Sequence, residues 1–315
     1  MLRVYYCDHC PIPLPQGHKF PIAKYALLRQ ALAAEDCFEL VPAPTASAGD
    51  VERAHDPAYV EAFVNGTLSG AAVRRIGFPW SAELVGRTMC SVGGTLAAAR
   101  QALATGFGGS LAGGTHHAFY GEGSGFCVFN DAAVAIRNLG VRAAVVDLDV
   151  HQGDGTASIF SGDPDVLTVS LHGRHNFPFR KQTSGIDIEF EDGARDEEYL
   201  SRVREVLPAV REFAPEVIFY QSGVDGLASD RLGRLSLTHS GLLERDRLVL
   251  ELCRDAQIPV VVTLGGGYAD PIVDTVDAHA NTFRTACGVF HQSATFDGIK
   301  ASSEVKGFAS GSADL

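Results

Sequence analysis

Five short apolar runs, separated by helical patterns, constrain the fold of this chain more than any other feature. Each run is rich in β-branched or aromatic residues, which is typical of parallel strands that are covered on both faces. They occupy residues 3–6, 143–149, 166–171, 217–222 and 259–264. Helical patterns lie at residues 81–106, 131–140, 196–213 and 240–256, the first opened by Ser81 and the second capped by Asp131. The alternation predicts one α/β domain on a mostly parallel sheet, with ligands beyond the carboxyl ends of the strands.

The composition excludes several classes of protein. Hydrophobic residues make up 46% of the 315 residues, so a disordered, collagen-like or disulfide-scaffold protein is excluded. The 26 basic and 38 acidic residues leave a net charge of −12, which argues against direct binding to nucleic acids or anionic membranes and suits cationic partners. No apolar run predicts a membrane span, and residues 1–15 lack the pattern of a signal peptide. Together with seven scattered cysteines, these features predict a reduced, soluble, cytoplasmic protein.

The chain shows no linker at which to divide it and no internal repeat. We therefore expect a single catalytic domain over residues 1–290. Residues 291–315 turn small and polar, which predicts a surface or mobile tail. The sequence does not indicate an oligomeric state.

The segment VVDLDVHQGDG carries the strongest chemical signal. Asp147, Asp149 and His151 alternate, so a strand would direct all three side chains to one side at its carboxyl end. Two carboxylates and an imidazole are costly there unless a cation or a proton network satisfies them. The alternative, a solvated strand end that caps the next helix through Asp154, explains one aspartate but not three polar residues on one side. The segment therefore favours a metal site.

A second strand is followed by GVDGLASD, which places Asp225 at the same edge of the predicted sheet. With Asp149 and His151 it makes three ligands and leaves a position for water, the pattern of catalytic zinc sites. Fe(II), Co(II) or Mn(II) would suit the same donors. Taken alone, Asp225 could also be a simple turn residue, because aspartate before glycine is common in turns.

Two glycine-rich loops complete the candidate site. His116 and His117 lie in a long loop with several aromatic residues, which favours function over a casual surface position. Beside an activated water, two imidazoles suit a general base and an electrostatic stabiliser. In LGGGYAD, the glycines allow close approach of a ligand, and Tyr268 would offer a hydroxyl donor. The alternative for Tyr268 is packing in a strand-to-helix turn.

Five motifs, GGTHHA, GFCVFND, DLDVHQGDG, SGVDGLASD and LGGGY, occur in an order that resembles the histone deacetylase family of metal-dependent deacylases. The resemblance extends from PLPQGHKFP near the N-terminus to about Phe290. It implies an arginase/deacetylase-like three-layer α/β/α sandwich around a central eight-stranded parallel sheet.

The resemblance also implies a role for each motif residue. Asp149, His151 and Asp225 would bind zinc. His117 would be the general base and acid, His116 its electrostatic companion, and Tyr268 the ligand of the substrate carbonyl. Asp147 and Asp154 would hold the two histidines. A monovalent cation, K⁺, would use Asp147, Ser170 and the backbone carbonyls of Asp149, His151 and Leu171.

Two residues depart from the commoner family pattern. Gln152 stands where many members have a second histidine, and Lys24 stands where many have arginine. Both resemble the class IV branch and its bacterial relatives. Neither replaces a proposed zinc ligand or base, so the departures bear on substrate preference. Cys7 and Cys10 have metal-like spacing, but no second pair follows, which disfavours a zinc knuckle.

The expected function is removal of acyl groups, acetyl or longer, from lysine side chains by a water that zinc activates. The substrate channel would be formed by Gly125, Phe126 and one of Phe177 and Phe179. The alternatives are an acetylpolyamine amidohydrolase, a dinuclear manganese ureohydrolase and a non-catalytic acyl-binding relative. The ureohydrolase is disfavoured because it needs an aspartate where this chain has Gly153. The non-catalytic relative finds no support, because every catalytic residue type that the family requires is present. Histones need not be the substrate.

Overall fold

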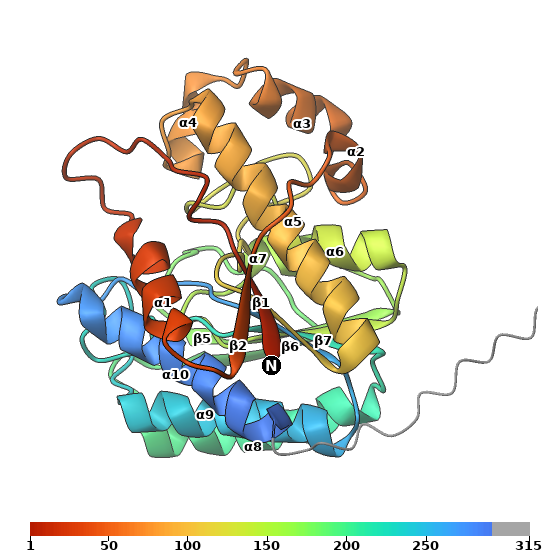
Figure 1. Cartoon of the computed structure of the whole chain (residues 1–315), viewed down its shortest axis with the longest axis vertical. Coiled ribbons are helices and arrows are strands. Elements are labelled where there is room, and N and C mark those ends of the chain that lie inside the picture. The colour runs from red at the N-terminus through yellow and green to blue at the C-terminus, as the bar shows by residue number, and fades with distance from the viewer. Residues whose placement is uncertain (292–315) are drawn as a thin grey trace, which may run out of the picture.

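The computed structural model describes residues 1–291, in which eight parallel strands form one sheet between two layers of helices (Figure 1). The strand order is β2-β1-β3-β8-β7-β4-β5-β6. The strands are β1 (Leu2–Tyr6), β2 (Phe38–Pro42), β3 (Phe107–Ser110), β4 (Ala143–Asp147), β5 (Val166–Gly173), β6 (Ile186–Phe190), β7 (Val217–Gln221) and β8 (Val260–Thr263). The predicted α/β class and eight-stranded parallel sheet are therefore confirmed.

The helices divide between the two faces of the sheet. They are α1 (Ala23–Ala33), α2 (Ala48–Val51), α3 (Pro57–Val64), α4 (Gly70–Ile76), α5 (Ala82–Thr105), α6 (Asp131–Leu139), α7 (Asp154–Ile159), α8 (Asp196–Glu212), α9 (His239–Asp255) and α10 (Ile272–His291). One apolar core lies between the sheet and α1, α8, α9 and α10, and a second lies between the sheet and α2 to α6. These two cores make the α/β/α sandwich of Figure 1.

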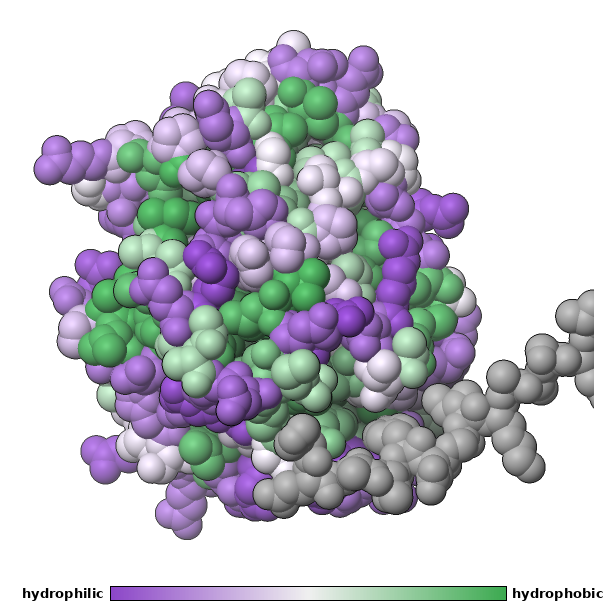
Figure 2. Space-filling model, viewed as in Figure 1, coloured by the Kyte–Doolittle hydropathy of each residue, from purple (hydrophilic) through white to green (hydrophobic). Residues whose placement is uncertain are grey.

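The central strands are apolar throughout because both of their faces are covered. In β4, Ala144 and Val146 belong to one core, and Ala143 and Val145 belong to the other. Successive side chains of a strand point to opposite faces, so each core receives every second residue. On the surface seen in Figure 2, areas of hydrophobic residues are broken up by hydrophilic ones.

The structure corrects one helix start in a way that matters for the site. Ser81 caps α5 as predicted, because its hydroxyl accepts the Leu84 N–H. The cap of α6, however, is Asn130, whose side chain accepts the Ala133 N–H. Asp131 is buried instead, and its carboxylate accepts the backbone N–H groups of residues 114 and 115. It thereby anchors the loop that leads to His116.

Three strands and the end of a fourth differ from the expectation. β2, β3 and β6 lack a long apolar run, since β3 reads FGGS and β6 is a half-buried edge strand. β4 ends at Asp147 rather than at Asp149. Asp149 and His151 thus lie in the loop beyond the strand, where their directions are set by tertiary contacts rather than by strand alternation.

The sequence predicted that all cysteines are reduced, and this is wrong. Cys37 and Cys287 form a disulfide between residues 250 positions apart in the sequence. The pair meets because α10 packs against α1, the helix that leads into β2. Among residues 1–291, no helix combines the length and the apolar character that a membrane span requires. His291 ends α10, and the rest of the predicted tail, 292–315, lies outside the described residues.

Candidate active site

Four neighbouring strands deliver the candidate site residues to one edge of the sheet. β3, β8, β7 and β4 are adjacent in the sheet order. The loop after β3 carries His116 and His117, the loop after β8 carries Tyr268, and the loop after β7 carries Asp225. Asp149 and His151 follow β4. All strands are parallel, so these loops meet at the carboxyl edge, where such sheets bind ligands.

A cavity of about 510 Å³ opens at this edge. Its lining includes the predicted site residues His116, His117, Asp149, His151, Asp225 and Tyr268. These six residues come from four loops that are far apart in the sequence, and they share one concave site.

Asp149, His151 and Asp225 form a compact group of possible metal donors. One ligand atom from each residue lies within 4.8 Å of the others. His151 Nδ1 is 3.0 Å from Asp149 Oδ1 and 3.0 Å from Asp225 Oδ2. Both carboxylates are buried. Two buried carboxylates and an imidazole suit a divalent cation, because a cation at their centre would compensate the charge that burial leaves unsolvated.

Backbone groups fix the two carboxylates in place. The Val150 N–H donates to Asp225 Oδ1 at 3.0 Å, and the Gly266 N–H donates to Asp149 Oδ2 at 2.6 Å. A Cβ at Gly266 would collide with Asp225, and a Cβ at Gly223 would collide with Asp149. Glycine is required at these two positions because the backbone approaches the carboxylates so closely.

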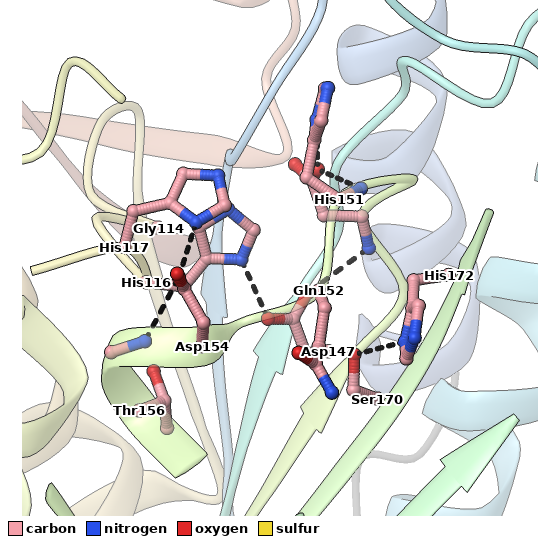
Figure 3. A network of polar contacts seen from close by, with 12 residues as sticks. Gly114, His116, His117, Asp147, His151, Gln152, Asp154, Thr156, Ser170 and His172 are labelled. Carbon is pink, nitrogen blue, oxygen red and sulfur yellow. Dashed lines mark hydrogen bonds and ion pairs between the residues drawn. The ribbon is translucent and has the colours of Figure 1, made fainter. Parts of the chain in front are cut away.

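Each histidine of the 116–117 pair is held by its own carboxylate (Figure 3). His116 Nδ1 lies 2.7 Å from Asp147 Oδ2, and His117 Nδ1 lies 2.7 Å from Asp154 Oδ1. The two imidazoles are neighbours, with ring centroids 4.0 Å apart. Because Nδ1 is paired with a carboxylate, Nε2 of each ring is available to contact a ligand bound in the cavity.

The surroundings give the two histidines different protonation. Burial, together with the neighbouring imidazoles of His116 and His151, lowers the pKa of His117 well below its ordinary value. Burial also acts against the charge on His116, but the carboxylates of Asp147 and Asp149 outweigh it and raise the pKa of His116 to about 9. The pair thus combines a neutral imidazole with a charged one, which is the division of labour of a base and an electrostatic companion.

Tyr268 lies in the cavity wall with its hydroxyl available. Burial raises the pKa of Tyr268 well above its ordinary value, so the hydroxyl stays protonated and remains a donor. The hydroxyl makes no hydrogen bond within residues 1–291. The backbone of the residue is held by Asp230, whose Oδ2 accepts the Tyr268 N–H at 2.6 Å.

Three of the four predicted channel residues line the cavity: Gly125, Phe126 and Phe177. The Phe177 ring meets the His117 ring edge to face at 4.8 Å. The prediction placed one of Phe177 and Phe179 in the channel; Phe177 takes this place, and Phe179 is excluded as a channel residue because its side chain is 85% exposed and does not line the cavity. The sequence could not separate the two phenylalanines, which lie on either side of Pro178.

The residues predicted for a monovalent cation come from β4, from the loop after it and from β5, which pairs with β4. Asp147 and Ser170 are register partners in the paired strands β4 and β5, and Leu171 follows Ser170. Ser170 Oγ contacts His172 Nδ1 at 3.0 Å, and the two side chains lie near Asp147 in Figure 3. Their use as cation ligands remains a prediction.

The two departures from the family pattern have defined surroundings. Gln152 turns away from the metal group and bonds to Gln182 and Asp187, so it ties the loop after β4 to the edge strand. Lys24 is buried and donates to the Gly265 carbonyl oxygen at 3.1 Å. Burial lowers the pKa of Lys24 to about 8. Lys24 therefore supports the glycine loop that approaches Asp149 and Asp225.

Sequence reasoning missed several residues of the site. Asp230 holds the Tyr268 backbone and Asp131 holds the histidine loop. Arg74 and Arg75, from α4, line the cavity. Asp230 lies in the SGVDGLASD motif and could have been singled out there. No local signal marked the arginines, because α4 reaches the cavity only through tertiary packing.

Residues 18–283 match the family described as "Histone deacetylase domain". An uncharacterized protein of Picosynechococcus sp. is 44% identical over 296 residues, which cover 91% of this chain and 98% of that protein. Histone deacetylase 2 of Arabidopsis thaliana is 34% identical over 59% of this chain and 51% of its own length. The chain thus spans about half the length of that deacetylase.

Two further relatives extend the range of similar proteins. A probable deacetylase of Methanothermobacter thermautotrophicus is 38% identical over 58% of this chain and 59% of its own length. The crystal structure of an acetylpolyamine aminohydrolase from Burkholderia pseudomallei superposes with a TM-score of 0.76, covering 92% of this chain and 98% of that one. At 21% sequence identity, this likeness shows the shared fold.

Proposed function

This chain belongs to the histone deacetylase family, and from that premise we propose that it is a zinc-dependent hydrolase that removes acyl groups from lysine side chains. Membership of the family supports deacetylase activity. The observation that carries the finer proposal is the meeting of three metal donors, two carboxylate-paired histidines and a free tyrosine hydroxyl in one cavity.

Asp149, His151 and Asp225 are the residues that would hold the ion. A divalent ion held there supplies Lewis-acid chemistry, since it polarises an amide carbonyl and lowers the pKa of water. Zn²⁺ suits two carboxylates and one imidazole, and Fe²⁺ or Co²⁺ would suit them too. K⁺ at Asp147, Ser170 and Leu171 is part of the same proposal.

His117 is the proposed base. Its Nδ1–H donates to Asp154, so the lone pair of Nε2 accepts the proton of the attacking water. The same Nε2 then returns the proton to the departing amine, which leaves as the amide C–N bond breaks. His116 stays charged through Asp147 and stabilises the negative charge that builds up beside it.

Tyr268 is the proposed donor to the substrate carbonyl oxygen. That oxygen gains negative charge as water attacks the carbonyl carbon, and a hydroxyl aimed at it stabilises the charge. Asp230 and the glycines before Tyr268 place its backbone, so the donor is in position before the substrate arrives.

The aliphatic stem of lysine suits the channel at Gly125, Phe126 and Phe177. Burial of each CH₂ group contributes about 0.8 kcal/mol. The net charge of −12 favours the approach of a cationic substrate. An acetylpolyamine is the second candidate, supported by the name of the solved structural neighbour. Arg74 in the cavity lining favours lysine over this candidate, because a polycation would meet a like charge there, whereas the charge of Arg75 is paired with Glu122.

A dinuclear ureohydrolase finds no support in the site. Such an enzyme would need a carboxylate at position 153, but a Cβ on Gly153 would collide with Asp147. Within residues 1–291, one group of three metal donors lies in the cavity.

We treat residues 1–290 as a single catalytic domain. A cytoplasmic location must accommodate the Cys37–Cys287 disulfide, because disulfides are rare in that compartment.

The decisive experiment compares kcat/KM for lysine peptides carrying acetyl, butyryl, octanoyl and myristoyl groups with that for acetylated polyamines. We expect acyl-lysine turnover that is lost on chelation and restored by Zn²⁺. Asp225→Asn should lose one equivalent of metal and its activity, whereas the exposed control Asp277→Asn should keep both. Turnover of polyamines alone would refute the lysine assignment, and full turnover after exhaustive chelation would refute the metal mechanism.

A further inference from the structure

A second group of metal-binding side chains lies outside the cavity, where the end of β1 meets α5. One ligand atom each of His9, Cys10 and Cys90 lies within 4.8 Å of the others. Cys10 follows β1, and Cys90 lies in the middle of α5, which packs against β1. None of the three lines the cavity. Their convergence is therefore independent of the site described above.

The turn after β1 presents the first donors. The Cys10 N–H donates to the Cys7 carbonyl oxygen at 3.0 Å, which closes a tight turn over the sequence Cys7-Asp8-His9-Cys10. Cysteines spaced in this way are typical of metal sites that use thiolates. What the sequence lacked was a further soft donor, and α5 supplies it in Cys90.

The spacing of the donors fits a tetrahedral ion. Cys90 Sγ lies 3.6 Å from His9 Nε2. Zinc binds sulfur at about 2.3 Å and imidazole nitrogen at about 2.0–2.1 Å, which at a tetrahedral angle separates two such ligands by about 3.6 Å. The two donors already stand at that separation.

Cys7, the other cysteine of this turn, is the candidate for a fourth ligand, and it lies outside the group of three whose ligand atoms are within 4.8 Å of one another. Its side chain interacts with that of Cys90, and both are almost completely buried. Arg87, one turn before Cys90 on α5, interacts electrostatically with Cys7 and would balance the charge of an additional thiolate. Burial as small apolar residues explains Cys7 and Cys90, but it does not explain why the exposed His9 and the half-buried Cys10 converge on the same point.

We propose that His9, Cys10 and Cys90, with Cys7 as the fourth donor, form a second metal site that binds a thiophilic divalent ion such as Zn²⁺. With four protein ligands it is structural rather than catalytic. Exposure of His9 leaves a path for the ion to enter. The ion links the N-terminal segment to α5. That segment continues to Phe20, which lines the catalytic cavity, and to Lys24, which bonds to the Gly265 carbonyl.

Cobalt titration of the full chain tests the proposal. Metal-free protein, handled without oxygen so that the free cysteines stay reduced and the Cys37–Cys287 disulfide stays intact, is titrated with Co²⁺ while near-ultraviolet thiolate-to-cobalt charge transfer is recorded. The wild-type protein should bind two equivalents, one of which produces the charge-transfer absorption. Cys90→Ser and the surface variant His9→Ala should each lose that absorption and one equivalent. Cys253→Ala, which removes a free cysteine elsewhere in the core, should behave as the wild type.

A variant of the catalytic cavity separates the two sites. Asp149→Ala should lose the equivalent without thiolate absorption and keep the other, whether or not the proposed deacylase activity is correct. Absence of thiolate absorption in the wild-type protein would overturn the second site. So would absorption that persists in both Cys90→Ser and His9→Ala. Since His9 is exposed, its variant should remain folded, so a loss there reports on the metal rather than on the core.

Discussion

His117 Nδ1 lies 2.7 Å from Asp154 Oδ1, and this pairing decides what the ring can do in the cavity. The Nδ1 atom is committed to the carboxylate, so the imidazole keeps its acceptor at Nε2. Burial raises the pKa of Asp154 to about 6, which still leaves the carboxylate ionised at neutral pH. Its neighbour His116 is paired in the same way with Asp147 but carries a positive charge, because its pKa is raised to about 9.

His117→Ala should therefore be more damaging to kcat than His116→Ala. Removal of a general base typically lowers the rate by about 10²–10⁴-fold, whereas His116 acts only through its charge. Steady-state kinetics on an acyl-lysine peptide measures both variants, and the exposed His175→Ala serves as the control. If His116→Ala is the slower variant, the two roles must be exchanged.

Tyr268→Phe should lower kcat strongly and leave folding intact. Loss of one donor to a developing oxyanion typically costs about 10²–10³-fold in rate. The ring remains to fill its place, so the melting temperature and KM should change little. Tyr120→Phe, at an exposed tyrosine, is the matched control. An unimpaired Tyr268→Phe enzyme would reduce Tyr268 to a packing residue.

Gly266→Ala should disturb the proposed catalytic metal site without removing any ligand. The new methyl group would collide with Asp225 and lie 2.9 Å from Asp149 Oδ2. Overpacking of this kind costs about 1–3 kcal/mol of the free energy of unfolding. Urea unfolding and metal analysis should show a loss in both. Gly288→Ala is the control, since its methyl group meets nothing within 4 Å and α10 should gain up to about 1 kcal/mol. Equal behaviour of the two variants would contradict the tight packing inferred at Gly266.

The free energy of unfolding should fall below pH 6.5, in part because of His55. This buried imidazole donates from Nδ1 to the Phe119 carbonyl at 2.9 Å and accepts the Asn130 N–H at Nε2, also at 2.9 Å. Burial lowers its pKa to about 4, although the backbone carbonyls oppose the shift.

The sign of this effect follows from proton binding. Between pH 6.5 and 4, His55 binds a proton in the unfolded state but not in the folded state. The contribution of His55 to the free energy of unfolding is therefore present above pH 6.5 and is lost as the pH falls. At about 1.4 kcal/mol per pKa unit, the loss attributable to His55 reaches roughly 3 kcal/mol. Denaturant unfolding at several pH values should give a flatter profile for His55→Gln than for the wild type or His175→Gln. Parallel profiles for all three proteins would show that His55 does not cause the loss.

Much of the fold and of the candidate site could be predicted from the sequence alone, because these features depend on the chemistry of short segments. Covered strands must be apolar, so five of the eight β-strands and the α/β class followed from short runs of residues. The motif residues could be assigned to one edge of the sheet because parallel strands all end on the same side. Asp149, His151, Asp225 and Tyr268 were named in this way, His116 and His117 were named from their glycine-rich loop, and all six line the cavity.

Tertiary structure decided what local pattern could not. Asp131 turned out to anchor the histidine loop rather than cap a helix, and Phe177 rather than Phe179 lines the cavity. Cys90 meets His9 across 81 positions of sequence, and Cys37 meets Cys287 across 250. Such contacts depend on the order of strands in the sheet and on how helices pack over it. The spacing of apolar residues indicates which face of a helix or strand is buried. It does not indicate which residue of another element that face contacts.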